Sequence, residues 1–338
     1  MAHDTRWDLP LPSRAATLEY MAAVLEQVLA ALAQAVPRLR YLATYAVFHE
    51  DMHGEAFAYT RQTLGYPAPA ITGARARGVG GAPPPAEPWP NHDCPVPAQT
   101  LLLGAAPGDS FVFDNEKWAH PVELSAFRIA RDAVTQGEFA EFVGDGGYAR
   151  PELWTRPGRE WLTRCGANHP LYWRPAPGAG GEWERRHFDR WVRLEPALPM
   201  VHVNAFEAEA WCRWRGRRLP TEAEWEAAAG RRRFPWGDEA PDATCANLDG
   251  LRLGCVDASA LPFGDSAAGC RQMMGNVWEW TSTPFAPYPG FTPDMYADYS
   301  QPWFHSHRVL RGGCWATRGR LLRNTWRNFY TPDRRDVW

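Results

Sequence analysis

The stretch Arg217-Arg-Leu-Pro-Thr-Glu-Ala-Glu-Trp-Glu-Ala-Ala-Ala229 says most about the fold of this 338-residue sequence. Gly216 stands directly before it and can end a preceding helix, because glycine adopts the left-handed conformation without a steric cost. Thr221 and Glu224 have the spacing of a capping box, in which each side chain satisfies a free backbone N–H at a helix start. The stretch therefore predicts a helix end, a short loop and a new helix.

Around this stretch, from Gln99 onward, short apolar runs alternate with turn signals, and no β-α-β repeat is present. This pattern predicts an α+β domain with short strands and much loop. Eighteen tryptophans, most of them after residue 85, favour a core built from large rings. Gly312-Gly313 allows a sharp turn after a strand. The apolar runs are residues 100–104, 111–113, 122–130 and 201–203, and the helical patterns are residues 135–143 and 205–216.

The N-terminal part reads as two helices, residues 13–37 and 38–64. The apolar run at 20–36 contains Glu26 and is too short to span a bilayer, so we expect an amphipathic core helix. Residues 73–98 are rich in glycine and proline and are expected to be a linker. The predicted organisation is a helical segment at 1–72, the linker at 73–98 and the larger domain at 99–338.

Charge and cysteine content narrow the class of protein. The net charge is -3 with acidic and basic residues interspersed, which predicts neither a nucleic-acid partner nor a membrane partner. Seven scattered cysteines without a C-x-x-C pair predict free thiols. The opening residues lack the pattern of a secretory signal, so a cytoplasmic location is expected.

The second helix carries His49-Glu-Asp-Met-His53. Residues four apart lie on one helix face, so the two imidazoles can bind one metal ion, although a complete site needs a third ligand. A surface helix that happens to carry two histidines is the simpler alternative. A zincin protease with Glu50 as base is another, but Ala56 and Tyr59 stand where the extended motif needs glycine and histidine.

Four segments in order resemble the formylglycine-generating-enzyme-like superfamily: residues 217–229, 234–238, 274–285 and 309–317. The resemblance implies a loop-rich fold related to C-type lectins over residues 99–338. Formylglycine generators use a pair of cysteines, and the matching positions here are Thr317 and Leu322. That cysteine chemistry is therefore not expected.

Further motifs make the whole chain similar to a second branch, in which this fold is joined to a DinB-like helical domain. They are residues 49–55, 113–116, 146–148, 288–291 and 326–330. This branch contains the nonheme iron sulfoxide synthases of ergothioneine biosynthesis and their relatives, including selenoneine synthase. The resemblance implies a three-histidine iron(II) centre that uses molecular oxygen. It bonds the sulfur of a cysteine derivative, or the selenium of a selenosugar, to the imidazole carbon of hercynine.

By this resemblance His49 and His53 are two of the three iron ligands. The third comes from a preceding helix in the family, and the opening of this chain resembles the segment that follows that helix. We therefore expect that the natural N-terminus is missing or altered. We also expect that a short C-terminal tail present in relatives is missing. His3 lies in a polar end segment and is a poor substitute for the third ligand.

Tyr296 and Tyr299 match two active-site tyrosines of the family. Tyr296 is the candidate catalytic acid, because a phenol beside the metal can donate a proton. A core tyrosine with one hydrogen bond is the equally simple alternative. Asn328 and Phe329 match residues that line the site, where an amide can bind an imidazole or carboxylate and a ring can cover the trimethylammonium group of hercynine.

Two departures bear on the second substrate. Met52 stands where many ergothioneine enzymes have a glutamine, and Tyr330 stands where some have an aspartate against the donor's amino group. Arg334 keeps the position of their carboxylate-binding arginine. These changes favour a selenosugar donor. A γ-glutamylcysteine- or cysteine-dependent sulfoxide synthase and a non-catalytic lectin-like binding module remain the alternatives.

Overall fold

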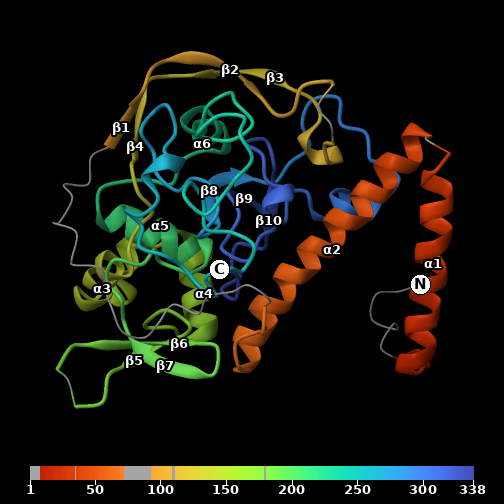
Figure 1. The fold of residues 1–338 in the computed structure, drawn as a ribbon. Coiled ribbons are helices and arrows are strands. Elements are labelled where there is room, and N and C mark those ends of the chain that lie inside the picture. Colours follow the sequence, from red (N-terminus) through yellow and green to blue (C-terminus); the bar gives the residue numbers. More distant parts are fainter. Residues whose placement is uncertain (1–7, 35, 72–92, 109–110, 179) are drawn as a thin grey trace. The chain divides into compact units, whose positions relative to one another are not determined.

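The computed structural model describes residues 8–34, 36–71, 93–108, 111–178 and 180–338. These residues form two compact units that meet in sequence at Glu50 and Asp51 (Figure 1). The first unit contains α1 (Arg14–Leu32) and the first part of α2 (Pro37–Leu64). The second contains the rest of α2 and all later elements. Most of the predicted linker lies outside the described residues.

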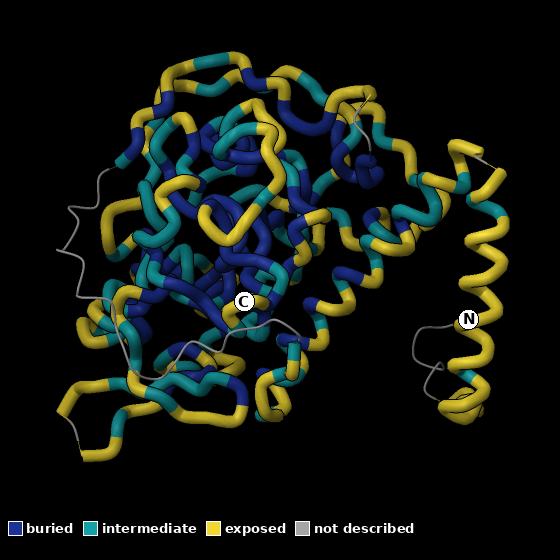
Figure 2. Tube along the Cα trace, viewed as in Figure 1, coloured by how far each residue is buried: buried dark blue, intermediate teal, exposed yellow. Residues whose placement is uncertain are grey.

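In the first unit, Ser13 caps α1 by accepting a hydrogen bond from the backbone N–H of Ala16 at 3.2 Å. The helix ends earlier than predicted, and Pro37 begins α2, where its missing N–H costs nothing. No residue of α1 is buried among the described residues (Figure 2), so the prediction of a core helix was wrong. The apolar side chains of α1 are therefore not part of a hydrophobic core among these residues. By length and composition α1 is long and apolar enough to cross a membrane, so the expectation that this stretch is too short was wrong; buried core helices and signal sequences share these two properties.

The strands of the second unit pair in antiparallel fashion and form four small sheets. The mixed helix and sheet class is as predicted. Charged side chains dominate β6 and β7, which is why the apolar pattern did not reveal their sheet. The strands are β1 (Asp93–Val96) with β4 (Phe127–Ala130), β2 (Gln99–Leu103) with β3 (His120–Leu124), β5 (Trp173–Pro175) with β6 (Trp183–His187) and β7 (Arg190–Arg193), and β8 (Glu279–Pro284) with β9 (Arg308–Arg311) and β10 (Asn328–Tyr330).

Three segments differ from the sequence expectation. Strand β1 lies inside the predicted linker, because Cys94 and Val96 are buried in a cluster with Trp225. Residues 111–113 and 201–203 are apolar but form no strand. These segments are buried or nearly buried coil, so apolar character there reflects packing and not sheet pairing.

The helices of the second unit follow their local signals. They are α3 (Gln136–Gly144), α4 (Arg156–Cys165), α5 (Ala205–Trp214) and α6 (Glu222–Ala229), with short 3-10 helices at residues 114–116, 147–149, 151–153, 262–264, 297–299, 301–303 and 319–321. The capping box of Thr221 and Glu224 is present. Gly216 follows α5 with φ +69°, and Gly312 and Gly313 follow β9 with φ +99° and +81°. These local predictions are confirmed.

A buried ionic layer fixes β9 and the segment of β10 against α6. Arg327 donates to both carboxylate oxygens of Glu222 at 2.7 and 3.0 Å. Arg311 pairs with Glu222 at 3.2 Å and also with Glu226. All four side chains are almost fully buried, so the loss of one partner would leave an uncompensated charge, at a cost of about 3–5 kcal/mol. This layer positions residues 328–330 directly after Arg327.

Candidate functional site

The second half of α2 is anchored in the second unit by a buried carboxylate. Glu55 accepts hydrogen bonds from Trp278 Nε1 at 2.6 Å and from Thr317 Oγ1 at 2.5 Å. Burial raises the pKa of Glu55, although both hydrogen bonds oppose this shift. Thr317 and Leu322, the two positions at which the resemblance implies cysteines in relatives, are both buried, and Thr317 contacts α2 through Glu55.

Further contacts extend this anchor along one face of the helix. Asp51 forms a bidentate ion pair with Arg320, with N–O distances of 2.7 and 2.8 Å. Gln62 is fully buried, donates to the Arg186 carbonyl at 2.9 Å and accepts from the Phe188 N–H at 2.5 Å. With Glu55, these residues define the anchored face of α2.

His49 and His53 are both in α2, so the helix presents them on one face as predicted. At about 100° per residue, His53 points roughly 160–180° away from Asp51, Glu55 and Gln62. It is accordingly exposed. The face of α2 that carries the two histidines is therefore opposite to the anchored face.

The donor chemistry fits iron(II) in part. Two imidazoles four residues apart can fill two positions of a facial iron site. Among the residues that the structure describes, no group of three histidine, cysteine or acidic side chains could hold a metal ion. His3 lies outside the described residues. The described chain thus contains two of the three histidines that the resemblance implies as ligands.

The segment with the two predicted tyrosines is tethered to residues 113–116. Lys117 forms an ion pair with Asp294 at 2.9 Å, and Ser300 donates to Asp114 at 2.5 Å. The ring of Tyr299 stacks on Phe113 with centroids 4.7 Å apart. Residues 113–117 therefore hold the tyrosine segment at both ends.

Tyr299 is the predicted residue that reaches α2 in this region. Its hydroxyl donates to Met52 Sδ at 3.7 Å, and its ring meets Phe329 edge-on at 5.9 Å. Burial raises the pKa of Tyr299 above its ordinary value, so the phenol stays protonated. Tyr296 differs, because 46 % of its surface is exposed. Its backbone carbonyl accepts from the Tyr299 N–H at 3.0 Å.

Strand β10 separates its three predicted residues by face, since successive side chains of a strand point to opposite sides. Phe329 stacks on Phe285 with centroids 4.0 Å apart, which covers one face of its ring. Asn328 and Tyr330 lie on the other side of the strand. Burial raises the pKa of the Tyr330 phenol well above its ordinary value.

Arg334 lies between two tyrosine rings and an acid. Its guanidinium carbon is 4.3 Å from the ring centroid of Tyr330 and 4.9 Å from that of Tyr59. It also forms a bidentate ion pair with Asp336. Tyr59 and Met52 are seven residues apart and so share one flank of α2, which contacts both Tyr299 and Arg334.

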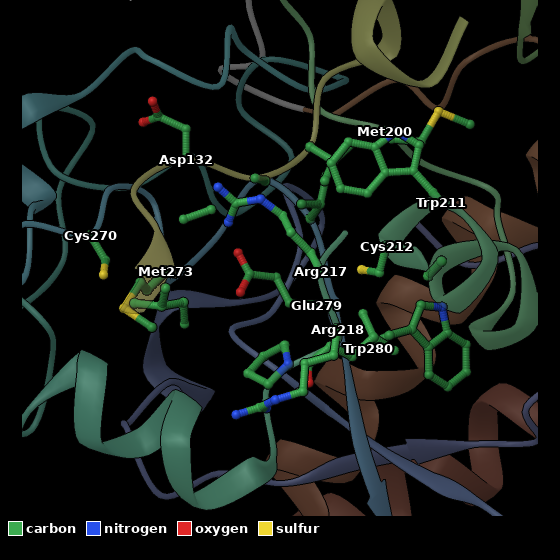
Figure 3. A pocket seen from close by; sticks show the side chains of 18 of the residues that line it. Asp132, Met200, Trp211, Cys212, Arg217, Arg218, Cys270, Met273, Glu279 and Trp280 are labelled. Atoms are coloured by element: carbon green, nitrogen blue, oxygen red, sulfur yellow. The ribbon is translucent and has the colours of Figure 1, made fainter. Parts of the chain in front are cut away.

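A large cavity in the described part of the chain lies elsewhere. It has a volume of about 780 Å³, and its lining includes Trp211, Cys212, Arg217, Met273 and Glu279 (Figure 3). Glu279 accepts from Trp225 Nε1 at 2.6 Å, and burial raises its pKa to about 7. The predicted site residues are not among the lining residues.

The structure thus brings Met52, Tyr299 and Phe329 into one set of contacts. Tyr330, Arg334 and Tyr59 form a second set, on the other side of β10 from Phe329. Tyr296 is exposed beside the first set, and His53 is on the adjoining exposed face of α2. Sequence reasoning missed the roles of Glu55, Tyr59 and Asp336. The position of Glu55, an acidic residue two positions after His53, was the only sequence feature that pointed to its role.

The family model for the sulfatase-modifying factor enzyme 1-like domain (FGE-sulfatase) matches residues 89–338. The chain therefore belongs to this family. Its relatives include the hercynine oxygenase of Mycobacterium tuberculosis, 40 % identical over 346 residues that cover 99 % of this chain and 78 % of the relative. The hercynine oxygenase of Mycolicibacterium thermoresistibile is also 40 % identical, over 351 residues that cover 99 % of this chain and 75 % of the relative. The formylglycine-generating enzyme of Streptomyces coelicolor is 32 % identical over 281 residues, 70 % of this chain and 84 % of that enzyme.

Proposed function

We propose that this protein is an iron(II)- and oxygen-dependent oxidoreductase that forms a C–Se bond between hercynine and a selenosugar, giving selenoneine. The similarity to hercynine oxygenases along 99 % of the chain carries the proposal that hercynine is a substrate. His49 and His53 would hold the iron, which would supply the activation of molecular oxygen. The partners of the protein are then small molecules in the cytoplasm, and all seven cysteines are free, in keeping with that location.

The remaining predicted residues would bind and orient the substrates. Tyr296 is exposed and would donate a proton at its hydroxyl, whereas Tyr299 would position Met52 and the neighbouring rings. Asn328 would offer an amide to the imidazole or carboxylate of hercynine, and the ring of Phe329 would offer a cation–π contact to its trimethylammonium group. Tyr330 and Arg334 would line the binding site of the selenium or sulfur donor.

The selenosugar is favoured because Tyr330 and Met52 leave an ammonium group of the donor without a carboxylate partner, which is costly in a buried site. A sulfoxide synthase that uses γ-glutamylcysteine or cysteine is the second candidate, and the retained Arg334 favours it. A non-catalytic lectin-like binding module is the third.

Oxygen uptake and product analysis by mass spectrometry test these candidates. The iron-reconstituted protein is supplied with hercynine and with each donor at equal concentration. We expect hercynine-dependent oxygen uptake and a higher kcat/KM with the selenosugar. A higher kcat/KM with γ-glutamylcysteine would assign the chain to the ergothioneine pathway, and iron-loaded protein without any oxygen uptake would support the binding module.

A further inference from the structure

We propose that Asp336 determines the class of donor, because it keeps the Arg334 guanidinium in an internal ion pair and so withholds it from a donor's carboxylate. The inference deepens the proposed function and rests on it for the identity of the reaction. The donor class that fits is an uncharged, hydroxylated molecule such as a sugar.

The ion pair has the geometry of a strong interaction. Arg334 Nε lies 2.7 Å from Asp336 Oδ1, and Arg334 Nη2 lies 3.1 Å from Oδ2. A planar guanidinium and a carboxylate joined by two parallel hydrogen bonds form the most favourable arrangement of these groups. The side chains are 31 % and 27 % exposed, so water screens the pair only in part.

The surroundings hold the guanidinium in place. The rings of Tyr330 and Tyr59 lie on Arg334, and Asp336 occupies the Nε–Nη2 edge, one of the two edges on which a guanidinium can bind a carboxylate through two hydrogen bonds. The pair has no net charge, and a second carboxylate would lie next to the first. Such a ligand would lose its hydration without gaining a free cation, whereas sugar hydroxyls and a sugar face need only the phenols and rings.

The same residues admit an opposite interpretation, in which Arg334 binds the carboxylate and Asp336 binds the ammonium of an amino-acid donor. Removal of the Asp336 charge distinguishes the two. It frees Arg334 and strengthens carboxylate binding if Asp336 is a competitor. It weakens the binding of an amino-acid donor if Asp336 is the ammonium partner.

Calorimetry with γ-glutamylserine provides the test, because this probe has the charged groups of γ-glutamylcysteine but no thiol and needs no turnover. With hercynine present, we expect Asp336→Asn and Asp336→Ser each to lower the Kd of the probe about tenfold relative to wild type. Asp333→Asn is the matched control, since it removes the same charge three residues away, where Asp333 lies 3.8 Å from Arg164. We expect the wild-type Kd for this control.

An unchanged or higher Kd in both Asp336 variants, with the wild-type circular dichroism spectrum, would overturn the inference. A lower Kd in Asp333→Asn as well would also overturn it, because the effect would then be one of general charge. Turnover is measured separately with both donors. If neither donor is consumed but the Asp336 variants bind the probe more tightly, the proposed function fails and the role of Asp336 stands.

Discussion

At the scale of single residues, Glu279 predicts a specific pH dependence of stability. Its pKa rises from 4.5 to about 7 on folding because burial disfavours the carboxylate, and the hydrogen bond from Trp225 only partly offsets this. The folded state therefore binds the proton more tightly than the unfolded state. The free energy of unfolding should fall as the pH rises from about 4.5 to about 7, by roughly 3 kcal/mol, and this contribution is constant above that range. Glu279→Gln keeps an acceptor for Trp225, so the variant should match wild type near pH 4.5 and exceed it by about 3 kcal/mol at pH 8. Urea unfolding at both pH values measures these free energies of unfolding. The control is Glu160→Gln, at an exposed position. The same pH dependence in wild type and Glu279→Gln would contradict the prediction.

At the scale of elements, Glu55 predicts how α2 is held. Glu55→Leu leaves the Trp278 N–H and the Thr317 hydroxyl without their acceptor, which should cost about 2–4 kcal/mol of stability. Glu55→Gln retains an acceptor and a donor, so its loss should be smaller. Hydrogen exchange should show faster exchange of the amides at 51–64 in Glu55→Leu, with little change in β8 and β9. Glu50→Leu, at an exposed position of the same helix, is the control. Equal acceleration throughout the second unit would show that Glu55 supports the whole fold and not the helix in particular.

At the scale of the whole molecule, the proposed iron centre predicts a shared site for α2 and the FGE-sulfatase domain. Replacing either His49 or His53 by alanine should abolish iron retention in the full-length protein, as measured by metal analysis, whereas His120→Ala should retain iron. The bound metal should lie within about 12 Å of Asn328, the width of a ligand pocket of about 1,000 Å³. A crystal structure of the iron-loaded protein with hercynine measures this distance. Full iron occupancy in both histidine variants, or a metal too far from Asn328 for one substrate to reach, would refute the shared site.

The sequence by itself determined the features that depend on neighbours a few residues apart. The capping box of Thr221 and Glu224, the extent of α2 and the turns at Gly216 and Gly312-Gly313 all follow from local hydrogen bonding and backbone conformation. The α+β class and the family also followed, because several motifs occur in order. The pairing of His49 with His53 on one helix face required only the helical period.

Only the tertiary structure decided which distant residues these elements contact. Glu55 meets Thr317 across 262 positions of sequence, and no local pattern encodes such a partner. Arg334 and Asp336 are only two residues apart, but the rings of Tyr59 and Tyr330 that lie against Arg334 come from α2 and β10. The exposure of α1 was likewise not readable from composition. Burial and charge compensation depend on which distant surfaces meet, and that is a property of the packed chain.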